Sequence, residues 1–397
     1  MEPLEFSSID GMNTRAPAHA LSRTTQGGAR ILIPRELRNL LVTDTGTLQT
    51  RPGFALAIAG TDVHSLWSDG KDRALYVDGT VLKDFAGTTL HTGIQGPVSA
   101  DVYGEDIYWS DGAYLGCIHN GANHLAALAP PNPAPMVSAT TGALPPGLYQ
   151  VAFTLSDDRG ESPSTWPIGV DLPNGGGLSI TGLPAVAVNV YLATAGSTVL
   201  QFFGSISGPI AIAAPPQLGH TLQTEGLMPM PPGKIVRAHN GRLLVARGKL
   251  IYFSEPFAPA LHRPVEGFIP FPDRVTMVRP NDEGVYVGTT KATYWLAGTD
   301  IAKAELVNVL RIGAAEHSDS LVDDEAGIVQ WFSHDGLVRG DQAGQVTAMQ
   351  SDTAPAQTAT RAATHHIDQG GTPYSVTTST RPSSAASIGS FMDAEIA

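Results

Sequence analysis

The sequence predicts an all-β protein in which a β-propeller-like domain is interrupted by an inserted β-sandwich and flanked by extended termini. Three observations predict this. Gly (43) and Pro (30) are abundant among the 397 residues, and only 15% of residues are charged, which favours short strands and tight turns over long helices. Short aromatic strand candidates recur along the chain. A stretch bounded by proline runs divides them into two groups.

The strand candidates before and after the insert share a turn signature. An aromatic residue followed shortly by Asp-Gly occurs four times, at Asp69, Asp78, Asp111 and Asp335. Because Gly accepts positive φ and Asp bonds to nearby backbone, each predicts the first half of a hairpin. The string Trp-Ser-Asp-Gly occurs at Trp67 and again 42 positions later, and Tyr286 and Trp331 lie 45 apart. These spacings match the repeat length of a propeller blade.

The composition along the chain predicts five segments. Residues 1–30 are expected to form an extended arm, and a short helical turn opened by Pro34 is expected between Ile31 and Leu41. The tail is rich in Thr, Ala, Ser and Gly and is expected to be extended. The segments are an arm (1–30), a first propeller segment (31–128), an inserted sandwich (129–233), a second propeller segment (234–350) and a C-terminal tail (351–397).

The insert carries its own strand signals. Gly147–Leu155 partly alternates apolar and polar residues, and further candidates follow at 178–180, 187–192 and 199–203. Several short strands between proline-rich linkers predict a small sandwich. The run from Tyr149 to Pro163, which ends Gly-Glu-Ser-Pro, resembles fibronectin type III-like modules, so a fibronectin III/Ig-like sandwich is expected.

Charge and cysteine content exclude several classes. A single cysteine, Cys117, rules out an internal disulfide framework. No apolar stretch is long enough to span a membrane, and no secretion signal is recognised. The net charge of -13 argues against a body that wraps DNA. Six arginines cluster near the start of the chain. They are interpreted either as ordinary solvated side chains or as a docking arm for an acidic partner. They are Arg15, Arg23, Arg30, Arg35, Arg38 and Arg51.

No standard catalytic fingerprint is present, so the chain is expected not to be an enzyme and to have no catalytic, cofactor-binding or metal residues. Two metal hypotheses are weaker than their structural alternatives. In the first group, the histidines and the cysteine are not spaced as metal ligands usually are. In the second group, the acidic residues lack the alternating ligand spacing of a calcium-binding loop. The first group is Cys117, His119 and His124 with His365 and His366. The second is Asp157-Asp158, Asn281-Asp282-Glu283 and Asp323-Asp324-Glu325.

Two further hypotheses concern sugars and nucleic acid. The four Asp residues of the Asp-Gly turns would supply the acid and base of a propeller glycosidase, but a turn role explains them fully. Five aromatic residues would form a stacking platform, but they lack interleaved basic residues and are better explained as blade packing. These are Tyr108, Trp109, Trp295, Trp331 and Phe332.

Two stretches resemble the packaged-DNA stabilisation proteins that form the tail nozzle or hub of short-tailed phages. Residues 37–54 carry an Asn-x6-Gly-x-Leu pattern that closes on Arg-Pro-Gly, with Asn39, Gly46, Leu48, Arg51, Pro52 and Gly53 at the matching positions. Residues 250–298 and Trp331–Gly340 are similar to the propeller strings of those proteins.

The resemblance implies a structural virion protein made in the host cytoplasm. Copies would form a six-fold ring below the portal and adaptor, around a channel through which the DNA leaves without specific binding, and would attach fibre or plug proteins. The competing hypothesis is a carbohydrate-binding or glycan-hydrolysing propeller that acts on a cell-surface polysaccharide. No cofactor is expected in either case.

Overall fold

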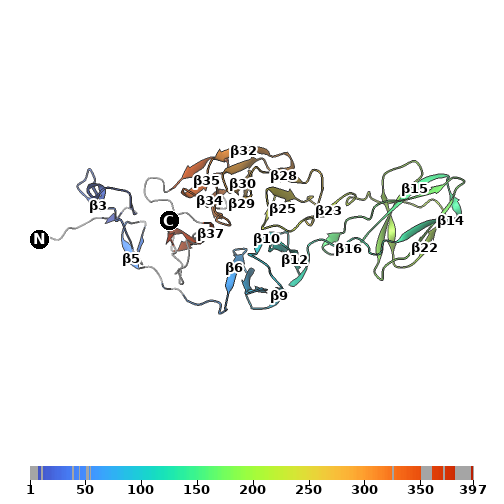
Figure 1. Ribbon diagram of the computed structural model, residues 1–397, viewed down its shortest axis with the longest axis horizontal. Helices are drawn as coiled ribbons and strands as arrows, with labels where there is room; N and C mark the ends of the chain where they lie inside the picture. The colour runs from blue at the N-terminus through green and yellow to red at the C-terminus, as the bar shows by residue number, and fades with distance from the viewer. Residues whose placement is uncertain are drawn as a thin grey trace. The chain divides into compact units, whose positions relative to one another are not determined.

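The computed structural model describes residues 8–9, 12–37, 40–43, 45–50, 53, 55–323, 326–349, 360–369, 372–380 and 395–396. Figure 1 shows its ribbon. The chain divides into two compact units. Unit 1 comprises Met1–Val63, Gly248–Leu250 and Pro270–Ala397, and unit 2 comprises His64–Arg247 and Ile251–Ile269. Nearly all regular structure is strand, as the composition predicts. The two short 3-10 helices among the described residues are η1 (Ala18–Ala20) and η2 (Ile301–Lys303).

Outside the inserted sandwich, unit 2 contains three four-stranded sheets. In the first two, strands follow chain order; in the third, β27 (Leu261–His262) leaves the sheet and pairs with β23 (Met228–Pro229). The first is β6 (Val63–Ser68), β7 (Ala74–Asp78), β8 (Val81–Asp84) and β9 (Thr89–Thr92). The second is β10 (Ser99–Tyr103), β11 (Asp106–Ser110), β12 (Leu115–His119) and β13 (Ala122–Leu125). The third is β24 (Ile235–His239), β25 (Arg242–Arg247), β26 (Leu250–Phe253) and β28 (Phe268–Pro270).

Unit 1 contains two more sheets of the same kind, antiparallel throughout. This four-stranded meander is the blade of a propeller-like fold, and it confirms the predicted class. The first is β29 (Val275–Asn281), β30 (Gly284–Thr289), β31 (Thr293–Ala297) and β32 (Glu305–Leu310). The second is β33 (Ser320–Asp323), β34 (Ile328–Ser333), β35 (Gly336–Gly340) and β36 (Val346–Ala348).

The inserted sandwich lies within unit 2 and buries an apolar core between two sheets. Tyr149, Val151 and Phe153 alternate along one strand and point into that core. One sheet is β14 (Met136–Leu144), β19 (Gly176–Thr181) and β22 (Ile210–Ile212). The other is β18 (Ile168–Leu172), β15 (Gly147–Thr154), β20 (Val188–Ala193) and β21 (Gln201–Ile206). A separate hairpin consists of β16 (Ser156–Asp157) and β17 (Gly160–Glu161).

The chain leaves one blade for the sandwich and returns to the adjacent blade. Strand β10 packs beside β24 although more than 130 residues separate them. The Ser99 hydroxyl accepts a hydrogen bond from the Val236 amide at 3.0 Å, and Asp101 accepts one from the Ala238 amide at 2.9 Å. The sandwich is therefore a true insertion between two blades that contact each other directly, as the long gap in the strand pattern predicts.

The repeated Trp-Ser-Asp-Gly string does not mark equivalent places in two blades. Trp67 lies on the first strand of its sheet, whereas Trp109 lies on the second strand of the next. The shared string reflects the same need for a turn at two different strand ends. Aromatic residues on the second strand of a blade are instead Tyr76, Tyr108, Tyr286 and Trp331.

Two local predictions are wrong. Instead of a helical turn after residue 31, Ile31 and Leu32 pair with β2 (Ser22–Thr24) and β1 (Ser8–Ile9) in β3 (Arg30–Leu32), and β4 (Leu40–Val42) follows, paired with β5 (Leu48–Thr50). Strand pairing overrides the weak helix-start signal of Pro34. In the tail, β37 (Arg361–Gln369) and β38 (Thr372–Thr380) form a long hairpin joined by β39 (Glu395–Ile396), because β-branched Thr supports strand pairing despite low hydrophobicity.

Candidate functional site

The structure gathers charged side chains where the inserted sandwich meets blade β10–β13. His119 Nδ1 lies 2.7 Å from Asp106 Oδ1, on the neighbouring strand of the same blade. His119 Nε2 lies 2.9 Å from Asp158 Oδ2, on the turn of the β16–β17 hairpin. The histidine side chain is 19% exposed, whereas that of Asp158 is 67% exposed. A single imidazole thus joins carboxylates of two different structural elements.

These carboxylates shift the protonation of the histidine. Hydrogen bonds to Asp106 and then to Asp158 raise the pKa of His119 above its ordinary value of 6.5, against a smaller opposing effect of burial. Reciprocally, the hydrogen bond from His119 lowers the pKa of Asp158. Both shifts favour an ion pair between the blade and the hairpin.

A second contact lies beside the first. Arg159 Nη1 donates a hydrogen bond to the Leu125 carbonyl oxygen of β13 at 2.8 Å. Its guanidinium also holds Asp157 Oδ2, through Nη2 at 2.7 Å and Nε at 3.1 Å. The Arg159 side chain is 11% exposed. The acidic turn at 157–158 is therefore a docking contact and not a calcium loop.

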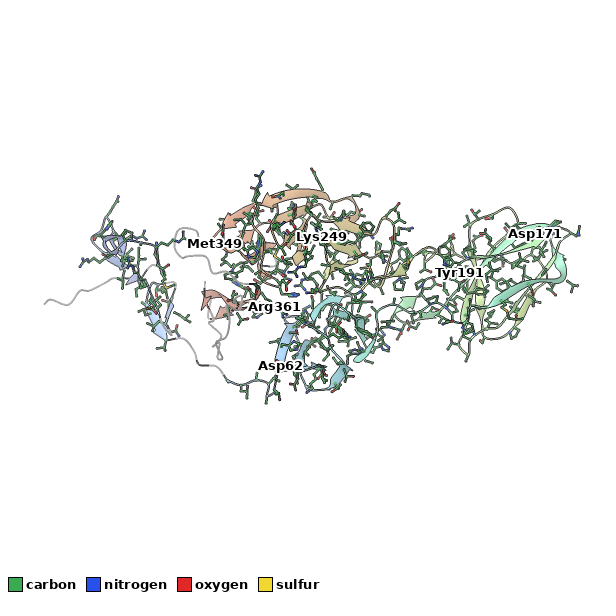
Figure 2. The ribbon with its side chains drawn as sticks, viewed as in Figure 1. Asp62, Asp171, Tyr191, Lys249, Met349 and Arg361 are labelled. Carbon is green, nitrogen blue, oxygen red and sulfur yellow. The ribbon has the colours of Figure 1, made fainter. Side chains whose placement is uncertain are left out.

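The hairpin is anchored equally firmly to the sandwich. Glu161 Oε1 accepts a hydrogen bond from the Tyr191 hydroxyl at 2.7 Å and another from Thr154. Burial is the main cause that raises the pKa of Tyr191, and its hydrogen bond to Glu161 adds to this. Figure 2 shows Tyr191 at the end of the sandwich opposite to Asp171, and Figure 1 shows β16 between the sandwich strands and β12. The hairpin is thus a strut fixed at both ends.

The residues weighed in the first metal hypothesis do not come together. Cys117 is fully buried, and burial raises the pKa of its thiol to about 12. His124 is its partner across the β12–β13 register, and His119 is engaged by carboxylates instead. His365 and His366 lie on β37 in unit 1. Within the described ranges, no group of three or more His, Cys, Asp or Glu side chains is arranged to hold a metal ion.

The remaining acidic clusters serve turns where they are described. Asn281 Oδ1 accepts hydrogen bonds from the amides of Glu283 at 3.1 Å and Gly284 at 3.0 Å, which closes the β29–β30 turn. Residues 324 and 325 lie outside the described residues.

The four Asp-Gly carboxylates are likewise held in local contacts or exposed. Asp69 binds Arg73 at 2.8 Å, and this bond is the main cause that lowers its pKa to about 2. Asp78 lies 3.0 Å from Lys83, and Asp111 accepts three backbone hydrogen bonds. Asp335 is exposed. Each follows or ends a strand that turns into a hairpin, which explains the recurrence of Asp-Gly.

The five aromatic residues of the suggested stacking platform are all buried. Tyr108 and Trp109 pack in different cores of unit 2. In unit 1, Trp295 and Trp331 share one core, and Phe332 packs in another. Their ring faces pack against other apolar side chains and are not accessible for stacking with a ligand. This agrees with the blade-packing interpretation.

The pattern at residues 39–53 is only partly described. Gly46 has φ +73, and its carbonyl accepts a hydrogen bond from the Ile9 amide at 2.8 Å. A Cβ at this position would lie 2.7 Å from the Cβ of Ser8, so only glycine fits. Leu48 is exposed on β5. Asn39, Arg51 and Pro52 lie outside the described residues.

Sequence reasoning missed the pairing of His119 with Asp158. The two residues stand in the two separate groups that were weighed as metal sites and judged structural, and 39 positions separate them. No local signal connects them, because the contact depends on how the insert packs against the blade. The strut residue Glu161 was likewise visible only as a member of a turn.

Comparisons with known proteins are uninformative about function. No protein-family model and no curated protein matches this chain. Among solved structures, BBS1N in complex with ARL6DN is similar at 12% identity and a TM-score of 0.33, over 82% of this chain and 93% of that one. The extracellular domain of a protein described as a putative one-component system of B. thetaiotaomicron has 10% identity and a TM-score of 0.26, over 85% of this chain and 58% of that one.

No helix among the described residues is long and apolar enough to cross a membrane. Because both structural similarities are remote, the chain's own sheets define its fold. That fold is an all-β, propeller-like arrangement of four-stranded meanders with an inserted sandwich.

Proposed function

We propose that this protein is a non-enzymatic structural subunit of a phage tail, a nozzle or hub that assembles with further copies around the DNA exit channel. In this proposal the ring lies below the portal and adaptor, retains and then releases the genome, and attaches other tail proteins. The family resemblance of residues 37–54, 250–298 and 331–340 is its starting point. The net charge of -13 is compatible with a DNA channel, because an acidic or neutral lining does not bind the phosphates of the passing DNA.

The observation that carries the proposal is the N-terminal segment, residues 8–62. Leu41 is the only buried residue among those of the segment that the structure describes. Its strands form sheets of two and three short strands, and Met12 and Leu56 are exposed. A segment that buries so little has scant stability of its own and gains burial by contact with another chain. This is the behaviour expected of an assembly arm. From here on, the arm means residues 8–62 and not only the extended segment 1–30 expected from composition.

The arm also offers a charge for recognition. All the arginines that the structure describes in this segment are exposed: Arg15, Arg23, Arg30 and Arg35. The chain as a whole is acidic, so a second copy presents the complementary charge. This supports arm-to-body contacts between copies of the chain.

Charge reversal of the arm tests the proposal. Replacing these four arginines by glutamate is expected to abolish higher-order assembly, whereas lysine at the same positions preserves charge and assembly. The mass of each protein would be measured by light scattering, alone and after mixing with the portal and adaptor proteins of a short-tailed phage, and ring-shaped species would be imaged by negative-stain electron microscopy.

The opposite outcome favours the competing hypothesis. A wild-type protein that stays at its monomer mass of 41.6 kDa, ignores the tail proteins and binds or cleaves a polysaccharide would overturn the tail proposal. Glycan binding would be measured by calorimetry and cleavage by release of reducing ends.

A further inference from the structure

The His119 ring contacts a carboxylate through each of its two nitrogens. Nδ1 faces Asp106 of the same blade, and Nε2 faces Asp158 of the strut. A neutral imidazole has one N–H and donates to one carboxylate only, whereas the imidazolium donates to both. The contact between blade and strut is therefore complete only when His119 carries two protons.

A neighbouring amide provides the alternative state. Asn120 Nδ2 lies 2.9 Å from His119 Nε2. When Nε2 is unprotonated, it accepts from this amide, and when it is protonated, it donates to Asp158. Asn120 is held there by a φ of +49 in the Asn-Gly turn between β12 and β13. The ring nitrogen thus has a partner in both protonation states.

We propose that His119 is a pH-responsive latch that fastens the inserted sandwich to blade β10–β13 through Asp158 when the imidazole is protonated and weakens this contact when the imidazole is neutral. The strut transmits this state, because its other end is fixed to the sandwich through Glu161. The two segments that connect the blades to the sandwich, between β13 and β14 and between β22 and β24, stay covalently linked in both states.

The direction of the pH effect follows from the surrounding groups. Asp106 faces the ring from within the blade whether or not the strut is docked, so only Asp158 distinguishes the two states. Arg159 follows Asp158 and partly offsets its negative charge. Cys117 and Tyr108 stay neutral because burial raises both pKa values, and His124 lies on β13 beyond Cys117.

Asp106 raises the pKa of His119 above 6.5 in both states, and docking of Asp158 raises it further. The latch is therefore closed at low pH and is lost as the pH rises through the raised pKa. Asp158 has a lowered pKa and remains ionised throughout this window. The hydrogen bond from Arg159 to the Leu125 carbonyl does not involve His119, and it limits the release to a weakening of the contact.

Hydrogen–deuterium exchange of the full chain tests the latch. After correction for intrinsic rates, opening of the strut (residues 156–161) is expected to increase between about pH 5 and pH 8. The increase is at most about tenfold for each pKa unit contributed by Asp158. His119→Gln should abolish this dependence, and His124→Gln on the adjacent strand should retain it.

A direct titration separates the latch from a purely structural contact. The pKa of His119, followed by NMR of labelled histidine side chains, is expected to fall in Asp158→Asn and to be unchanged in His124→Gln. Asp158 is mostly exposed, so its substitution leaves the fold intact. An unchanged His119 titration in Asp158→Asn, or an equal pH dependence of strut exchange in His119→Gln and wild type, would overturn the proposal.

Discussion

Replacing Trp331 with alanine is expected to lower the free energy of unfolding of unit 1 by about 3–5 kcal/mol. The side chain is fully buried. Its ring centroid lies 5.2 Å from that of Tyr286, and it packs against residues of β29, β30, β31 and β35. Truncation leaves a cavity in the core of two sheets, which the surrounding strands fill only partly.

Phenylalanine at the same position is the matched control. Trp331 Nε1 is buried and has no hydrogen-bond partner among the described residues. Trp331→Phe therefore removes a polar atom that contributes no bond, and it should cost far less than the alanine variant. Both would be measured by urea unfolding monitored by circular dichroism. Equal losses for the two variants would show that the indole N–H has a partner and that cavity formation is not the main term.

The second large effect is expected at Asp111. Its Oδ1 accepts hydrogen bonds from the amides of Ala113 at 2.9 Å and Tyr114 at 2.8 Å, and its Oδ2 accepts one from the Gln95 amide at 2.9 Å. Asp111→Ala removes all three acceptors from a side chain that is 9% exposed. We expect a loss of about 2–4 kcal/mol in the stability of unit 2, because three part-buried amides lose a charged acceptor, and a hydrogen bond to a charged group contributes about 1.5–3 kcal/mol.

Asp335 offers the comparison, because it also precedes a glycine between two paired strands but is exposed. Asp335→Ala should change stability by no more than about 0.5 kcal/mol. Thermal unfolding of both variants, with exchange measured on peptides of each unit, would locate the loss. If Asp335→Ala destabilises the protein as much as Asp111→Ala, the turn sequence itself matters, and burial of the carboxylate does not decide the effect.

The insert was predictable because its signals are local. Proline runs, alternating apolar residues and the long gap between blade-like segments all lie in the primary sequence. Hairpin turns were predictable for the same reason. The Asn120-Gly121 and Asn240-Gly241 turns, with φ values of +49 and +76 and of +43 and +74, carry a hairpin signal as strong as that of Asp-Gly.

The blade register was not predictable from the repeated string. Trp67 and Trp109 share their neighbours in sequence but occupy different strands, because a turn motif reports where a strand ends and not its order within a sheet. The C-terminal hairpin was missed because composition measures how much a segment can bury, whereas β37 and β38 are joined by backbone pairing along nine residues each.

The sequence by itself determined the all-β class, the insertion and the Asp-Gly hairpins, since periodicity and turn chemistry act over a few residues. Only the tertiary structure decided that Asp158 meets His119 and that β10 meets β24. Those contacts join residues 39 and more than 130 positions apart, and they depend on the packing of complete sheets, which no short pattern encodes.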